Sequence, residues 1–317
     1  MKAVLTKGWG LSPQLTVAEK SDPGRLGAED VLVQVHAASV NPKDWKLNYH
    51  AARLAGPLLI KTLPPLFGDD LAGTVLAVGS RVRDFAVGDA VYGMDMRPRT
   101  ASLAKKTRIN QQCIAHKPAS LSFAQAAAMP LAAQTALQGL RKGKAKAGSR
   151  VLIIGASGGV GCFAVQIAKA MGAQVTGVCS GRNTAFVTQL GADAVIDYTQ
   201  GDYRQSAGPF DLVFDVSSYE SPLSCARLLA DNGVFISTGG DARSMLATPL
   251  YRVFGKQAGT VVVESWRRDL DTLSELVDSG KLTPIIDSEY PLADSEQAYQ
   301  RSRTGRCRGK VVIRVKE

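Results

Sequence analysis

The stretch that most constrains the fold is "VLIIGASGGVGCFAVQIAKAMGAQVTGVCS", residues 151–180. An apolar run leads into a glycine-rich turn, then into an amphipathic segment with helical spacing, then into a second apolar run. A strand, a turn, a helix and a strand within about 30 residues form a βαβ unit. Further apolar runs alternate with helical stretches up to residue 266, and this alternation predicts a doubly wound parallel sheet with helices on both faces.

The turn of this unit carries glycines at positions 155, 158 and 161. Because it follows an apolar strand and opens a helix, it has the context of a dinucleotide-binding turn. We expect Gly158 to let the backbone approach a pyrophosphate at the helix N-terminus, and Gly161 to allow close helix packing. A merely structural glycine turn is the alternative. The residues of the turn predicted to contact the cofactor are Ser157, Gly158, Gly159, Val160 and Gly161.

The second strand of the unit ends in "VCSGRN", residues 178–183. An NAD-binding protein usually carries an acid here for the ribose hydroxyls. This strand end offers the Ser180 hydroxyl, the Gly181 N–H group and the Arg182 guanidinium instead, which favour a 2′-phosphate and therefore NADPH. Tyr198 is expected to close over the same phosphate. The alternative is a solvated Arg182 and a preference for NADH.

The 317 residues suffice for two domains. Residues 1 to about 120 read as short strands broken by Gly and Pro, as expected of a partly open barrel. The Ala-rich segment 122–142 has helical spacing, with Pro130 predicted to kink or restart the helix. "TVVVES", residues 260–265, reads as a strand, and so does the terminal "VVIRV", which is expected to rejoin the first domain. We predict a domain 1–120 completed by 267–317, and a cofactor domain 121–266.

Composition limits the remaining possibilities. The net charge of +10 is compatible with a polyanionic partner, but aromatic residues make up only 6% of the chain, and no basic region is interleaved with stacking residues. Nucleic acid is therefore an unfavoured partner, with the basic segment 301–310 as the place where it would bind. The five cysteines are far apart in sequence, which indicates reduced thiols. No apolar run is long enough to span a membrane, and we predict a cytoplasmic protein.

The sequence resembles the medium-chain dehydrogenase/reductase superfamily, in particular its zinc-independent quinone oxidoreductase and alkenal (enone) reductase branch. The most specific match is "FGDDLAGTVLAVGSRVRDFAVGDAVYGM", supported by "SVNPKDWK", "LAAQTALQGL", "LGADAVIDY" and "RCRGKVVIRV". The resemblance covers essentially the whole chain. It implies a GroES-like β-barrel catalytic domain and a Rossmann cofactor domain. One departure lies at Lys105 and Lys106, where relatives often carry an acid and an aromatic residue.

Zinc-dependent alcohol dehydrogenases of the superfamily place Cys and His-Glu in segments that here contain Asn41 to Asp44 and Gly68-Asp69-Asp70. The cysteine-rich structural zinc lobe is absent from the sequence, and the three histidines are scattered. We therefore predict no metal. Without a Lewis acid, alcohol oxidation lacks its usual means of polarising the oxygen, so the expected substrates are already electrophilic quinones, enals or enones.

The resemblance also implies roles for individual residues. Asn41 and Thr135 are expected to position the nicotinamide or its ribose, and Gly239 and Gly240 to let the backbone approach the ring. Arg308 and Gly309 are grouped with the cofactor-binding residues. Tyr49 is a candidate proton donor to the developing enolate, with solvent or a mere packing role as alternatives.

Two expectations concern assembly and activity. The segment "GTVVVES", residues 259–265, is predicted to be an edge strand that pairs with its copy in a homodimer, because exposed edges favour such pairing. An NADPH-binding sensor or scaffold with little turnover is the alternative to an enzyme, since a fold does not fix a function.

Overall fold

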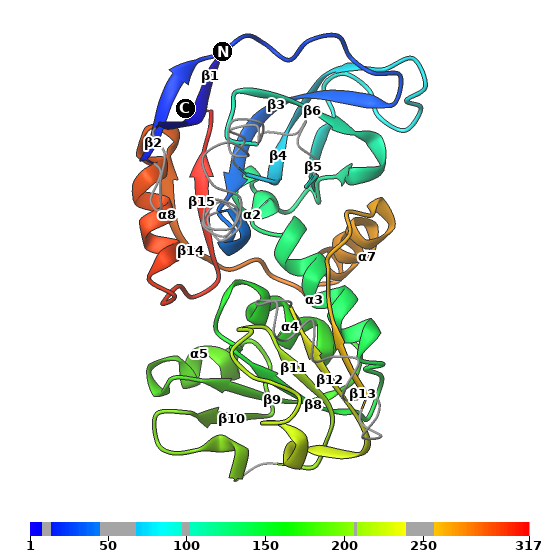
Figure 1. The fold of residues 1–317 in the computed structure, drawn as a ribbon. Helices are drawn as coiled ribbons and strands as arrows, with labels where there is room; N and C mark the ends of the chain where they lie inside the picture. The colour runs from blue at the N-terminus through cyan, green and yellow to red at the C-terminus, as the bar shows by residue number, and fades with distance from the viewer. Residues whose placement is uncertain (8–13, 45–67, 97–101, 206–207, 239–256, 317) are drawn as a thin grey trace. The chain divides into compact units, whose positions relative to one another are not determined.

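The computed structural model in Figure 1 describes the chain except for residues 8–13, 45–67, 97–101, 206–207, 239–256 and 317. The chain divides into two compact units. The first comprises Met1–Leu131, Ser265–Asp278 and Pro284–Glu317, and the second comprises Ala132–Glu264 and Ser279–Thr283. Residues 121–131 thus belong with the first unit, whereas the sequence placed them in the cofactor domain. Among the described residues, no helix has the length and apolar character needed to cross a membrane.

A seven-stranded sheet forms the framework of the first unit. Six strands follow the order β14-β15-β3-β4-β5-β7, and β6 pairs with β3 off this path. The C-terminal β15 pairs antiparallel with β3, with Ile313 opposite Ala38, so the last strand rejoins the first unit as predicted. The strands are β3 (Asp30–Ser39), β4 (Asp70–Val78), β5 (Ala90–Met94), β6 (Lys106–Asn110), β7 (Ile114–His116), β14 (Ile286–Pro291) and β15 (Lys310–Arg314).

An antiparallel hairpin and three helices complete the first unit. The hairpin joins β1 (Lys2–Lys7) to β2 (Gln14–Glu19), and the helices are α2 (Phe123–Ala127), α7 (Arg267–Asp278) and α8 (Ser295–Arg303). Along β3 the residues alternate between half-buried and buried from Asp30 to Ala37. This alternation places Val31, Val33 and Val35 in the hydrophobic core of the unit.

The second unit is built on a six-stranded parallel sheet in the order β10-β9-β8-β11-β12-β13. From the central β8 the chain passes to β9 on one side, while the later β11 lies on the other side. This reversal is the topological switch point at which doubly wound sheets bind ligands. The strands are β8 (Arg150–Ile154), β9 (Gln174–Cys179), β10 (Ala194–Asp197), β11 (Phe210–Asp215), β12 (Leu229–Ser237) and β13 (Gln257–Thr260).

Three helices belong to this region of the chain, namely α3 (Pro130–Lys142), α4 (Gly159–Ala170) and α5 (Thr184–Gln189). The predicted break at Pro130 is confirmed, because α2 ends at Ala127 and α3 begins at the proline. Short 3-10 segments are η1 (Gln111–Cys113), η2 (Gly181–Asn183), η3 (Tyr203–Gln205), η4 (Ala226–Leu228) and η5 (Leu292–Asp294).

The strand predicted over residues 260–265 is largely wrong. The observed strand β13 ends at Thr260, and only the Val261 N–H continues the ladder, to the Ser237 carbonyl. The backbone then leaves the sheet because the Gln138 side chain binds both the N–H and the carbonyl of Glu264. β13 does lie at the edge of the described sheet, but Val262 is 68% exposed beyond its end.

Candidate functional site

The candidate site begins at the glycine turn between β8 and α4 in the second unit. The N–H groups of Gly155 and Ala156 donate to the Val178 carbonyl at 3.1 and 3.0 Å, which fixes the turn to the end of β9. Gly158 is the N-cap of α4, with no side-chain cap and no acid in the first helical turn. The first N–H groups of a helix have no partner within the helix, so this N-terminus presents donors and the positive end of the helix dipole to an anion.

The glycines at positions 155, 158 and 161 of the turn have different surroundings. Gly155 has φ +87°, a conformation that side chains rarely adopt. A Cβ on Gly161 would lie 2.2 Å from the Gly155 carbonyl oxygen, so close packing within the turn requires glycine there. A Cβ on Gly158 would meet only the Gly155 oxygen, at an ordinary 3.4 Å. Neither packing nor backbone conformation requires a glycine at position 158. The close approach of a ligand would account for the glycine there.

Asn183 connects the glycine turn to the end of β9, and sequence reasoning missed it. Its side chain is 5% exposed and donates from Nδ2 to Ser157 Oγ at 3.0 Å and to Ser180 Oγ at 3.3 Å. The two serine hydroxyls predicted to contact different parts of the cofactor are therefore held by one amide. A small polar residue at the start of a helix following a strand was the only signal in the sequence.

The end of β9 is not free of acid. Asp197, the last residue of β10, lies opposite Cys179 of β9, and a Cβ on Gly181 would be 2.4 Å from Asp197 Oδ2. Thr199 holds the other carboxylate oxygen, donating from N at 2.9 Å and from Oγ1 at 2.7 Å. Hydrogen bonds from Thr199, Gln200 and the Gly181 N–H lower the pKa of Asp197, which is therefore ionised at neutral pH. Gly181 was predicted to donate to the cofactor, but its N–H is directed to this carboxylate.

Two predicted phosphate contacts lie beside this carboxylate. Tyr198 donates its backbone N–H to the Cys179 carbonyl at 3.1 Å, and its side chain is 54% exposed. Arg182 is exposed in η2, two residues after the half-buried Ser180. Burial raises the pKa of the Cys179 thiol, and the negative charge of Asp197 raises it further. The thiol therefore stays neutral. The strand end thus presents a hydroxyl, a cation and an anion together.

In the first unit, Asn41 belongs to a buried cluster of polar side chains. Asn41 is 1% exposed and donates from Nδ2 to Asp70 Oδ2 at 2.9 Å, while its Oδ1 accepts from Lys310 Nζ. Asp70 also accepts from Ser39 Oγ at 2.5 Å and from the Leu131 N–H at 2.7 Å. Lys310 lies 3.5 Å from Asp70 and donates to the Val40 carbonyl at 3.1 Å. Both ends of the Asn41 amide are thus engaged, which fixes its orientation.

A second acidic group lies next to this cluster. Asp44 Oδ2 accepts from the Asn41 N–H and from the Tyr299 hydroxyl, both at 3.0 Å. Burial, followed by the charge of Asp69, raises the pKa of Asp44 to about 7. Burial likewise raises the pKa of Asp69, although Lys43 Nζ lies 2.5 Å from its Oδ2.

The other predicted residues lie in several parts of the chain. Thr135 is 6% exposed on α3 of the second unit. Arg308 is exposed in the first unit and donates its N–H to Asp287 Oδ1 at 2.8 Å. A Cβ on Gly309 would lie 2.3 Å from the Ile285 carbonyl oxygen, so backbone packing alone explains that glycine. Tyr49, Gly239 and Gly240 lie outside the described residues.

The structure shows a further buried acid that the sequence did not single out. Asp215 closes β11, is fully buried, and accepts hydrogen bonds from the backbone N–H groups of Ser217, Ser218 and Glu220 at 2.8–3.0 Å. Burial raises the pKa of its carboxyl group, and these hydrogen bonds oppose the effect. Asp215 therefore shapes the loop at the carboxyl end of β11, next to the central strand.

Two other expectations can be compared with the structure. Within the described part of the chain, no group of three or more His, Cys, Asp or Glu side chains is arranged to hold a metal ion, and the metal-free site stays a prediction.

In the basic segment 301–310, Arg301 donates twice to Asp287 at 2.8 Å and Lys310 is buried. Both cations thus bind groups of the protein itself, which weakens the alternative that this segment binds nucleic acid.

Two family models match the chain. The model described as "Alcohol dehydrogenase GroES-like domain" matches residues 27–139, and the model described as "Zinc-binding dehydrogenase" matches residues 190–313. Together they cover parts of both structural units.

Curated relatives match over most of their length. A zinc-type alcohol dehydrogenase-like protein of Schizosaccharomyces pombe is 35% identical, covering 93% of this chain and 89% of the relative. The 2-methylene-furan-3-one reductase of Solanum lycopersicum is 33% identical, covering 90% and 71%. The mitochondrial NAD(P)H oxidoreductase RTN4IP1 of Homo sapiens is 34% identical, covering 90% and 82%.

A solved structure shows the same fold. The quinone oxidoreductase from Coxiella burnetii superposes with a TM-score of 0.87 at 30% identity, covering 100% of this chain and 99% of that chain. The GroES-like and Rossmann-type architecture predicted from the sequence is thereby confirmed.

Proposed function

The chain belongs to the medium-chain dehydrogenase/reductase superfamily, and from that premise we propose that it is an NADPH-dependent reductase of quinones or α,β-unsaturated carbonyl compounds. An oxidoreductase that uses a nicotinamide cofactor is what the family comparison supports. The proposal has five further parts: a preference for NADPH, the substrate class, a zinc-free site, a cytoplasmic location and a homodimer.

The observation that carries the proposal is the open N-terminus of α4. No protein contact requires a glycine at position 158, and the helix start has neither a capping side chain nor an acid. Such a terminus fits a pyrophosphate, because the charge of the anion meets free N–H donors. The Asn183 amide then keeps Ser157 and Ser180 in register along the path from pyrophosphate to adenine ribose.

The choice of NADPH rests on Arg182, Ser180 and Tyr198. A guanidinium and two hydroxyls match the charge and acceptor oxygens of a 2′-phosphate. Asp197 opposes this preference, because its ionised carboxylate lies against Gly181. We propose that the donors outweigh the acid, and that NADPH is preferred over NADH by a margin that Asp197 limits.

The proposed substrates follow from the names of the relatives and from the chemistry of the chain. The relatives include a quinone oxidoreductase and a reductase of an enone-type furanone. The bound nicotinamide would supply hydride, and the chain would supply binding, orientation and a dry environment. The buried cluster around Asn41 gives a rigid support for positioning, since both ends of its amide are fixed.

The test is an NADPH-oxidation screen of the purified protein with quinones, enals, enones and simple alcohols. We expect oxidation of NADPH with at least one electrophilic class and no comparable alcohol oxidation with NADP⁺. Binding of NADPH without turnover on any of these compounds would instead favour a sensor or scaffold. Stoichiometric zinc in elemental analysis, lost on chelation together with activity, would contradict the zinc-free site.

A further inference from the structure

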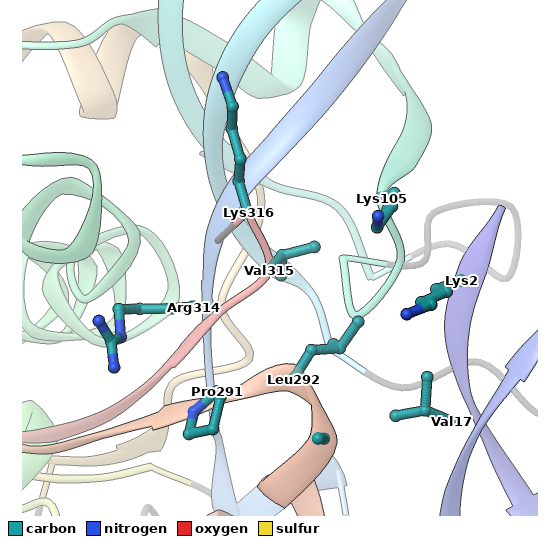
Figure 2. Close-up of a pocket in the computed structure, with 9 residues that line it drawn as sticks. Lys2, Val17, Lys105, Pro291, Leu292, Arg314, Val315 and Lys316 are labelled. Atoms are coloured by element: carbon teal, nitrogen blue, oxygen red, sulfur yellow. The ribbon is translucent and has the colours of Figure 1, made fainter.

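A pocket of about 270 Å³ lies in the first unit, at the junction of the N-terminal hairpin and the C-terminal strand. Figure 2 shows its lining, which comes from five separate segments of the chain. None of these residues was predicted to contact cofactor or substrate. The lining residues are Lys2, Val17, Lys105, Pro291, Leu292, Ala293, Arg314, Val315 and Lys316.

Four of the nine lining residues carry a positive charge, and none carries a negative one. Arg314 lies 3.8 Å from Glu289, a loose and exposed pair. In the part of the chain that the structure describes, no carboxylate lies within ion-pair distance of the other three, which are Lys2, Lys105 and Lys316. Like charges that gather without a counter-charge destabilise the fold, and a bound anion offsets that repulsion.

The backbone fixes two of these cations as neighbours. Ala3 and Ala104 form a β-bridge, and the Lys105 N–H donates to the Lys2 carbonyl at 3.0 Å. Figure 2 shows Lys2 and Lys105 on one side of the pocket, Arg314 on the other, and Val315 and Leu292 between them. Lys2 and Lys105 therefore flank an apolar centre, whereas the Arg314 and Lys316 side chains extend away from it.

Lys105 and its neighbour Lys106 differ in their surroundings. Lys106 has a partner, since its Nζ lies 2.5 Å from Asp22 Oδ2. Lys105 instead lines the pocket and is exposed. Lys105 is thus an exposed cation to which the proposed reductase function gives no role.

The centre of the pocket is aliphatic. Val315 and Leu292 are 3% and 8% exposed, and both belong to the hydrophobic core of the unit. Val17 packs against the same core from the hairpin. A hydrated inorganic anion would contact the cations but not the small apolar surface that these side chains leave open, whereas a ligand with an apolar body would cover it.

From this arrangement we propose that the pocket binds a small amphipathic anion of the aryl or branched aliphatic carboxylate class. Its carboxylate lies by Lys2 and Lys105, and its apolar body covers Val17, Leu292 and Val315. A pocket of about 270 Å³ has room for a molecule the size of benzoate. The site requires no cofactor and no turnover, so it stands apart from the proposed reductase function.

The test uses the full chain and calorimetric titration with three probes, namely benzoate, benzyl alcohol and inorganic phosphate. We expect benzoate to bind in the millimolar range or tighter, and benzyl alcohol and phosphate to bind at least about tenfold more weakly, because each offers only one of the two features. The double variant Lys2→Gln with Lys105→Gln should weaken benzoate about tenfold or more. The matched control Lys146→Gln removes one exposed charge from the second unit and should change nothing.

Each other outcome overturns the proposal. Equal loss in Lys146→Gln would mean that net charge alone attracts benzoate. Phosphate binding as tight as benzoate would remove the role of the aliphatic centre. Benzoate binding that survives the double variant, or that NADPH displaces competitively, would place the anion elsewhere. Because the readout is binding to a protein without substrate, a failed reductase assay leaves this result interpretable.

Discussion

Gly181 and Asp197 are in direct contact, with the carboxylate of Asp197 occupying the space that a side chain at 181 would need. The strand that precedes Gly181 carries no acid of its own, and β10 supplies one from the neighbouring position in the sheet. The same strand end carries Arg182. A cation and an anion therefore act in opposite directions on any phosphate bound there, and their two effects can be separated by mutation.

Replacing Arg182 by Ala is expected to weaken NADPH and leave NADH nearly unchanged. Charge-assisted hydrogen bonds contribute about 1.5–3 kcal/mol, and each 1.4 kcal/mol is about tenfold, so the loss in NADPH affinity should be roughly ten- to hundredfold. It will be smaller if Ser180 and Tyr198 share the phosphate. Fluorescence titration with both cofactors measures it, with Arg150→Ala at the other end of the sheet as the control. Equal weakening of both cofactors would assign Arg182 to the fold or to the adenine.

Replacing Asp197 by Asn is expected to have the opposite sign. The change removes a negative charge beside the 2′-phosphate and keeps an acceptor for Thr199, so NADPH affinity should rise about three- to tenfold at low salt and less at high salt. NADH affinity should stay level or fall. Asp231→Asn is the matched control, since it removes an exposed carboxylate at the other end of the sheet. A loss of both affinities, independent of salt, would show that Asp197 serves only to hold the turn.

The sequence predicted those features of the site that depend on residues close to one another in the chain. The glycine turn, the Pro130 break and the parallel order of strands follow from residues close in sequence, and these predictions agree with the structure. The approach of Asp197 to Gly181 depends on the pairing of β10 with β9, which the chain reaches only after α5. The strand predicted over residues 260–265 was wrong because the prediction used only the local Val-rich pattern. The side chain of Gln138, more than a hundred residues earlier, hydrogen-bonds the N–H and carbonyl groups of Glu264.

The buried cluster of Asn41, Asp70 and Lys310 shows the same limit. Asn41 was singled out by resemblance, but nothing in the spacing indicated that a lysine almost 270 positions later would bind its amide oxygen. A run such as "RCRGK" reads as a solvated basic surface, since lysine is seldom fully buried. Only the return of β15 to β3 brings Lys310 into the first unit.

Gly158 and Gly161 provide a matched pair of variants. Gly161→Ala places a Cβ 2.2 Å from a backbone oxygen and should destabilise the second unit by about 1–3 kcal/mol, as overpacking does. Gly158→Ala meets only a 3.4 Å contact and should keep the melting temperature, yet lose affinity for NADPH and NADH alike. Thermal unfolding and titration together separate the two. If Gly158→Ala binds both cofactors normally, the pyrophosphate does not approach this residue.

Stability of the first unit should depend on pH through Asp44. The pKa of this carboxyl is raised to about 7, first by burial and then by the charge of Asp69, so the folded chain keeps a proton that the unfolded chain releases near pH 4. More protons bound in the folded state means that the stability it contributes is fully present below about pH 4 and is lost as pH rises toward about 7. Asp44→Asn keeps an acceptor for Tyr299 and for the Asn41 N–H, but cannot titrate. As the pH rises through this window, the unfolding free energy of the wild type should therefore fall relative to that of Asp44→Asn, and the difference should level off above it.

Urea unfolding followed by tryptophan fluorescence measures this difference, because all three tryptophans fall within the ranges of the first unit. Asp231→Asn should show no such shift, and a difference that stays constant from about pH 4 to pH 8 would mean that Asp44 is ionised throughout.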